Sequence, residues 1–197
     1  MYKVFVIIFI FSNFLFAQLK GMPEFFSLDG YKTLKFGMNI EEANNKITNY
    51  NIELYADFHQ EIKLNENTVL NIYKNIDDKL AYYLYFYNNY LYRIEVCNHI
   101  GYSYNNNNDF YYPSEATDIE NIKEKITFKY GNSSSTDIKY YSHYNKPFEE
   151  YTIWWYSDLS SVSLYVKPDL NSLDKVIKLY SYRLSFYDEM KLKEIYK

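Results

Sequence analysis

Residues 36–47, FGMNIEEANNKI, combine a glycine turn with a helix start and set the pattern for the rest of the chain. Gly37 permits a sharp turn, and the Asn39 side chain can accept a hydrogen bond from the backbone amide of Glu42, as an N-cap residue does. The Glu42 side chain can reach back to the Asn39 amide, which completes a capping box. A helix that starts here brings three apolar side chains onto one face: Ile40, Ala43 and Ile47.

The segment after this helix has the pattern of consecutive antiparallel strands. Residues 52–64, IELYADFHQEIKL, alternate apolar and polar side chains almost without a break, which is the period of a half-buried strand. Asn88 and Asn89 suit a two-residue hairpin turn, because Asn tolerates a positive φ. The sequence therefore predicts a four-stranded antiparallel meander over residues 52–64, 68–74, 80–87 and 90–97.

The second half of the chain repeats this order of a helix followed by strands. Thr117 and Glu120 have capping-box spacing before a helix predicted over residues 118–130, and Gly131 is suited to end it. The expected fold class is α+β, with short helices packed on an antiparallel meander sheet, in one or two helix-plus-sheet modules. Further strands are predicted at residues 138–144, 151–157, 162–166 and 175–187, and residues 188–197 suit a short charged helix or a tail.

The F-G-M-x-x-E-E start at Phe36, before a short helix and a meander, resembles the small bacterial envelope modules of the SmpA/OmlA type. Two such modules in tandem are similar to the beta-lactamase-inhibitor architecture. The resemblance implies a first module at residues 18–113 and a second at residues 114–197. Residues 47–51 read ITNYN where those modules carry an L-G-x-P turn, and no lipidation cysteine is present, so the resemblance implies a fold and not an activity.

Residues 1–17 have the pattern of a secretory signal peptide, with Lys3 followed by an apolar run from Val4 to Ala17. Such a run is too short for a membrane-spanning helix, which needs about 20 residues. An uncleaved anchor is the alternative interpretation. We therefore expect an exported protein in the periplasm, at the cell surface or outside the cell, with no transmembrane segment in the mature chain.

Composition and charge restrict the classes of function. The formal net charge is −4, and sequence-independent nucleic-acid binding needs a basic face, so that function is not expected. The single cysteine, Cys97, rules out an intramolecular disulfide and suits a small buried apolar residue. Aromatic residues make up 21% of the chain, an excess that a sugar-binding surface or the codon bias of an AT-rich genome would each explain.

Motifs for catalysis are not apparent in the sequence. The sequence has no nucleophile elbow, P-loop or dinucleotide-binding fingerprint, and its histidines lack zinc-site spacing. The nearest group is Asp57, His59 and Glu61, which would lie side by side on the polar face of the first strand about 6.5–7 Å apart. We expect no catalytic residue, no metal and no cofactor, and the alternative is a hydrolase of envelope polymers centred on these three residues.

Binding is the function class that the sequence favours. Loops rich in Tyr, Ser, Gly and Asn provide adaptable contact surfaces, and residues 101–113 have that composition. The 140–151 region is a second candidate surface because it contains Tyr140, Tyr141, Tyr144 and Tyr151. Trp154 and Trp155 are adjacent in a strand, so one should face the core and the other the opposite side. The expected partner is a protein or another envelope component; a glycan-binding module is the alternative, and it would place several tyrosines and a Trp on one sheet face. The predicted contact residues are Tyr102, Tyr104, Tyr111, Tyr112 and Trp154.

Overall fold

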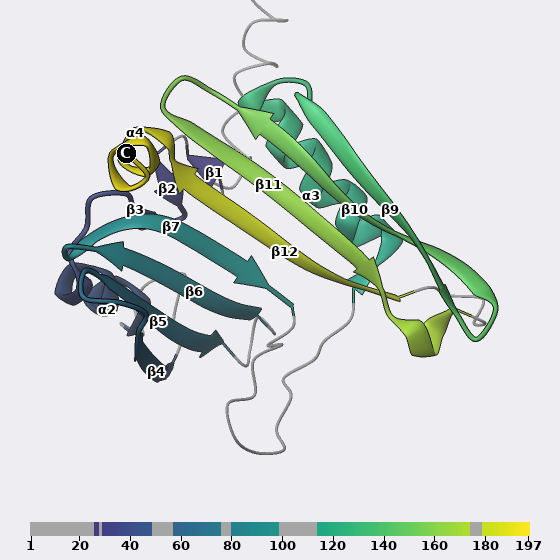
Figure 1. The fold of residues 1–197 in the computed structure, drawn as a ribbon, viewed down its shortest axis with the longest axis horizontal. Coiled ribbons are helices and arrows are strands. Elements are labelled where there is room, and N and C mark those ends of the chain that lie inside the picture. Colours follow the sequence, from purple (N-terminus) through teal and green to yellow (C-terminus); the bar gives the residue numbers. More distant parts are fainter. Residues whose placement is uncertain (1–25, 28, 49–56, 76–79, 99–113, 174–178) are drawn as a thin grey trace, which may run out of the picture.

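The computed structural model describes residues 26–27, 29–48, 57–75, 80–98, 114–173 and 179–197 (Figure 1). Within these ranges the protein is α+β and dominated by antiparallel sheet. The helical segments are α2 (Ile40–Thr48), α3 (Ala116–Tyr130), α4 (Glu189–Ile195) and a single 3-10 turn at Leu170–Ser172. None of the helices in the described ranges is long and apolar enough to cross a membrane. The predicted signal peptide at residues 1–17 lies outside the described residues.

The start of α2 confirms the predicted capping box. The Glu42 amide donates to Asn39 Oδ1, and the Asn39 amide donates to the Glu42 carboxylate, each at 2.9 Å. Gly37 adopts φ +90°, a conformation that side-chain-bearing residues rarely take. The Gly37 amide donates to the Leu91 carbonyl at 3.0 Å, and the Leu91 amide donates to the Met38 carbonyl at 2.9 Å. The turn therefore joins α2 to the sheet through the backbone.

The described strands form two sheets. The small one consists of β1 (Phe26–Ser27), β2 (Gly30–Tyr31) and β3 (Leu34–Lys35). The large one has the order β4-β5-β6-β7-β12-β11-β10-β9, with the short β8 (Ser114–Glu115) paired beside β12. Its long strands are β4 (Asp57–Lys63), β5 (Thr68–Asn75), β6 (Leu80–Tyr87), β7 (Tyr90–Cys97), β9 (Ser135–His143), β10 (Lys146–Tyr156), β11 (Ser160–Pro168) and β12 (Leu179–Asp188).

Each half of the chain contributes one helix and then a meander of four long strands: α2 with β4–β7, and α3 with β9–β12. The last strands of the two meanders pair antiparallel, with Glu95 opposite Ser185 and Ile94 opposite Phe186. β4 and β9 consequently occupy the two outer edges of one continuous sheet (Figure 1). The sequence left open whether the two halves share a core, and the structure places them in one sheet with one main core.

The main core lies between the sheet and the helices. Ala43 and Ile47 of α2 and Ile119 and Ile126 of α3 are buried in one cluster with strand residues of both halves. The small sheet fills the middle of the same layer, since the Tyr31 ring lies 5.3 Å from that of Phe186. We call this side of the sheet the helix face and the opposite side the open face. The helix-face strand residues in the cluster include Tyr82, Leu84, Ile94, Trp155, Val162, Leu184 and Phe186.

Two local predictions are wrong in detail. The second helix begins at Ala116, and the carboxylate of Asp118 accepts from the Glu115 amide at 3.0 Å, so the cap does not involve Thr117 and Glu120. In β4 the pairing shifts register between Phe58 and Gln60, which inserts one extra residue and interrupts the period-two alternation. The predicted end of the second helix at Gly131 is confirmed, with φ +82° and its amide donating to the Thr127 carbonyl.

Because the two halves share a core, we expect them to unfold together. Leu84 of β6 is fully buried, and truncating a buried Leu to Ala costs about 2–5 kcal/mol. Both tryptophans of the chain lie in β10, in the other half. Leu84→Ala should therefore lower the urea midpoint seen by Trp fluorescence as much as the midpoint seen by far-UV circular dichroism. Leu64→Ala, at an exposed position, is the control and should leave both midpoints unchanged. If Leu84→Ala left the midpoint seen by Trp fluorescence unchanged, the shared core would be contradicted.

Candidate functional site

The adjacent tryptophans of β10 point to opposite sides of the sheet, as the sequence predicted. Trp155 is only 1% exposed and belongs to the main core. Trp154 is partly exposed and lies on the open face, opposite Ser163 of β11. Its ring stacks at 5.9 Å on that of Tyr156, with an angle of 5° between the ring planes. Trp154 is thus the predicted contact residue that the structure describes, and it has aromatic neighbours.

The stack continues across β11 onto β12. The Trp154 ring lies 6.0 Å from that of Tyr187, although β11 separates their strands. β11 carries Ser161 and Ser163 between them, and these buried serines are small enough for the large rings to lean over the strand and meet. Tyr156 remains 50% exposed, so the outer side of this stack is accessible.

Arg93 of β7 extends the row to the first half of the chain. Its guanidinium carbon lies 5.1 Å from the Tyr187 ring centre and 4.5 Å from that of Tyr85, both within the range of cation–π attraction. The rings and the guanidinium form a row across β6, β7, β12 and β10, which we call the aromatic ladder. Its members are Tyr85, Arg93, Tyr187, Trp154 and Tyr156.

A buried carboxylate lies beneath the ladder. Glu95 is 3% exposed, and it accepts hydrogen bonds from Tyr85 Oη at 3.0 Å, from Ser185 Oγ at 3.1 Å and from Arg93. Arg183 Nε lies 3.8 Å from the same carboxylate. A buried charge persists only when it is paired and hydrogen-bonded, and these donors meet that condition for Glu95. The carboxylate therefore holds Tyr85 and Arg93 in place from below.

Arg93 and Arg183 are the only arginines among 21 basic residues. The other nineteen are lysines, which lack the planar guanidinium that can stack on rings while it bonds a carboxylate. Arg183 stacks 5.5 Å from the ring of Tyr165, whose hydroxyl donates to Glu150 at 2.7 Å. Both arginines therefore occur where one side chain must contact aromatic rings and Glu95 at the same time.

Burial and neighbouring charges raise the pKa values of three groups in and beside the ladder, and this suits a structural role better than nucleophilic chemistry. Burial raises the pKa of the Tyr85 phenol, and the Glu95 carboxylate raises it further. Burial lowers the pKa of Arg93, but the nearby Glu95 and the phenols of Tyr187 and Tyr85 outweigh that effect and keep it above the ordinary value. Burial, reinforced by Glu95, also raises the pKa of the Cys97 thiol, so this buried cysteine stays protonated and unreactive, and its predicted burial is confirmed.

Four of the five predicted contact residues lie outside the described residues: Tyr102, Tyr104, Tyr111 and Tyr112. In the 140–151 region, Tyr140 and Tyr144 are well exposed, and Tyr141 stacks on Phe148 at 5.5 Å. Tyr151 instead packs against the main core. The tyrosines of that region therefore do not form one surface.

The structure also corrects the alternative site on the first strand. Asp57 pairs with Lys74 and Glu61 pairs with Asn71, so the register shift between them puts these two positions of β4 on opposite faces of the sheet. The expectation that they lie side by side with His59 on one face is wrong. Among the described residues, no group of three or more His, Cys, Asp or Glu is placed to hold a metal ion.

Sequence reasoning missed Tyr85, Arg93, Glu95, Tyr156 and Tyr187. Alternation within each strand indicates which residues share a face, but residues about 90 positions apart meet here through the pairing of β7 with β12. One signal was available: two arginines in a chain that otherwise uses lysine. Both mark the strands that meet at the centre of the sheet.

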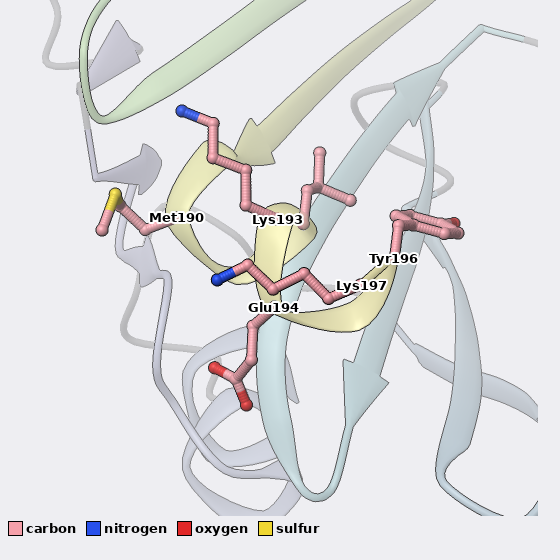
Figure 2. A pocket seen from close by; sticks show the side chains of 6 residues that line it. Met190, Lys193, Glu194, Tyr196 and Lys197 are labelled. Carbon is pink, nitrogen blue, oxygen red and sulfur yellow. The ribbon is translucent and has the colours of Figure 1, made fainter.

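A hollow on the surface of α4 does not provide a competing site. Its lining comes from the helix and the two residues after it, and Figure 2 shows the labelled side chains radiating from the helix axis instead of converging. Met190 and Tyr196 are 62% and 77% exposed. No set of polar groups is therefore aimed at a common point there.

Arg93→Lys should separate the role of the guanidinium from that of its charge. A lysine keeps the positive charge near Glu95 but cannot stack on Tyr85 and Tyr187 while it makes that bond. We expect a loss of about 1–3 kcal/mol in the free energy of unfolding, within the usual range for a disturbed buried network. Urea unfolding measures it; Lys139→Arg on exposed β9 is the control, and an equal effect of both would contradict the stacking role.

The buried phenols predict a loss of stability at alkaline pH. Burial raises the pKa of Tyr73 from 10.0 to about 12, and burial also raises those of Tyr85 and Tyr165. Above pH 10 the unfolded chain releases these protons while the folded protein retains them, so stability falls with rising pH. The fully buried Tyr73 contributes a slope of up to about 1.4 kcal/mol per pH unit. Urea unfolding between pH 8 and pH 11 measures the slope.

The variant Tyr85→Phe/Tyr165→Phe should show a shallower slope over the same pH range, because two of the retained protons are gone. Absorbance at 295 nm follows phenol ionisation directly in the folded protein. If all tyrosines ionised near pH 10 before unfolding, the burial of these phenols would be contradicted.

No protein-family model matches this chain, and neither a curated protein nor a solved structure gives a match. The resemblance to SmpA/OmlA-type modules therefore stays a prediction from the residues around Phe36.

Proposed function

We propose that this protein is an exported, non-catalytic binding protein that holds its ligand on the aromatic ladder. The proposal depends on one observation: Tyr85, Arg93, Tyr187, Trp154 and Tyr156 form a continuous row on the face of the sheet opposite α2 and α3. The ladder residues are partly exposed, Tyr156 the most at 50%, and a row of large side chains of this kind offers contact area at little cost in side-chain entropy.

Carbohydrate is the ligand class that this surface suits best. Aromatic rings provide apolar faces on which the C–H faces of sugar rings can stack, and Tyr and Trp also carry polar atoms at their edges. Polar groups that fix orientation lie beside the rings, since Arg93 and Arg183 supply N–H donors. The placement of a Trp and several tyrosines on one sheet face is the arrangement that the glycan-binding interpretation of the sequence required.

The predicted export of the chain supports the same ligand class. A protein released across the membrane by its signal peptide would meet the polysaccharides of the envelope or of the surroundings. The acidic net charge of −4 favours neutral or cationic glycans over strongly anionic ones. The hydrolase alternative loses support, because the register shift in β4 separates the positions of Asp57 and Glu61 on which it depended.

Trp154 provides a direct test, since it is the more accessible of the two tryptophans. Residues 18–197 should be titrated with soluble peptidoglycan fragments, neutral oligosaccharides and an acidic polysaccharide while Trp fluorescence is recorded. A ligand that stacks on the ladder should shift or quench the Trp154 emission and leave that of the buried Trp155 unchanged.

Calorimetric titration with the responding glycan then measures the effect of single substitutions. Trp154→Ala and Tyr187→Ala should weaken binding about tenfold or more, because truncation of a central aromatic contact commonly costs over 1.4 kcal/mol. Phe128→Ala, on the exposed side of α3, is the matched aromatic control and should change nothing. If no glycan in the panel changes the Trp fluorescence, the carbohydrate proposal is wrong. If a glycan binds Trp154→Ala and Tyr187→Ala as tightly as the native chain, the ladder is not its binding site.

A further inference from the structure

β9 leaves one complete backbone edge available for pairing. It pairs with β10 in unbroken register from His143 opposite Lys146 to Ser135 opposite Trp154, and its other side has no strand partner within the described chain. Along its length, side chains on both faces are exposed, including Tyr140 at 73% on the helix face and Tyr141 at 44% on the open face. A long regular edge of this kind is a template for another strand.

The opposite edge of the sheet is protected in the ways that natural proteins use. β4 is interrupted by the register shift between Phe58 and Gln60, which breaks the regular backbone pattern of this edge. α2 also contacts β4. β9 has no such shift. Opposite charges two residues apart occur on both edges, as Asp137 and Lys139 in β9 and as Glu61 and Lys63 in β4, so the regular backbone is what distinguishes β9.

The sequence of β9 is complementary to itself. In antiparallel pairing about Ile138, Asp137 lies opposite the partner's Lys139 and Lys139 opposite the partner's Asp137. Ile138 then meets the partner's Ile138, and Thr136 meets the partner's Tyr140. Pairing about Lys139 would instead place two lysines directly opposite each other, which is destabilising. Neither Asp137 nor Lys139 forms an ion pair with another described residue.

We propose that a second copy of this chain pairs with β9 in that register and forms a symmetric dimer with one continuous sheet. The two-fold axis passes through Ile138 and stands perpendicular to the sheet, because both strands are antiparallel and present the same face. Within the chain, β7 and β12 already join the two halves by antiparallel pairing in one sheet. Fibre-like growth stops at the dimer, since the outer edge of each copy is β4, which is interrupted by its register shift and contacts α2.

This dimer places the open faces of both copies on one side of the joined sheet. The β9 positions on the open face are those of Asp137, Lys139 and Tyr141, because Asp137 pairs with Thr152, two residues from Trp154. Two aromatic ladders would then face the same way. A polymeric ligand that reached both would bind with the gain expected of a bivalent surface.

Charge exchange tests the proposal with matched variants. Sedimentation equilibrium of the native chain should show a dimer. Asp137→Lys and Lys139→Asp should each be monomeric, since each sets like charges opposite each other twice. A one-to-one mixture of the two variants should form a heterodimer, and Asp137→Lys/Lys139→Asp in one chain should restore the homodimer. Circular dichroism should be the same for all of them, because these side chains are exposed.

A crosslink tests the register separately. Ile138→Cys lies on the two-fold axis and should form a covalent dimer on oxidation, whereas Ser142→Cys, four positions away, should not; the native Cys97 is buried. A native chain that stays monomeric at every concentration would overturn the proposal. The proposal would also be overturned if both single charge variants remained dimeric. The same holds if Ser142→Cys formed the covalent dimer and Ile138→Cys did not.

Discussion

The pairing of β7 with β12 is the constraint on which the rest of the structure depends. It joins two meanders that are far apart in sequence into one sheet, and it places Ile94 beside Phe186 on the helix face and Arg93 beside Tyr187 on the open face. The main core and the aromatic ladder are therefore two sides of the same strand pair. A change in this register by one residue would exchange the two faces and disrupt both.

Small residues matter as much as large ones on the open face. Ser161 and Ser163 leave space over β11 that the rings of Trp154 and Tyr187 fill from either side. Glu95 of β7 is costly to bury, and that cost is offset by its bonds to Arg93, Tyr85 and Ser185. The buried serines and the paired Glu95 therefore hold the side chains of the ladder in place.

Local signals predicted local structure well. The capping box of Asn39 and Glu42 is confirmed because its hydrogen bonds join residues three apart in the chain, so the sequence contains both partners. The two wrong local predictions, in β4 and at the start of α3, concern places where the local structure meets a neighbouring strand. The extra residue in β4 is visible only in its pairing with β5, and the cap of α3 moved to Glu115 and Asp118, where β8 pairs with β12.

The sequence by itself determined the α+β class, the order of helix and strands in each half, the opposite orientation of Trp154 and Trp155, and the burial of Cys97. These properties depend on alternation and on hydrogen bonds between near neighbours. Only the tertiary structure decided which strands meet at the centre of the sheet, and hence which side chains share its open face. Contacts between β7 and β12 join residues about 90 positions apart, and the alternation within one strand does not determine which other strand pairs with it.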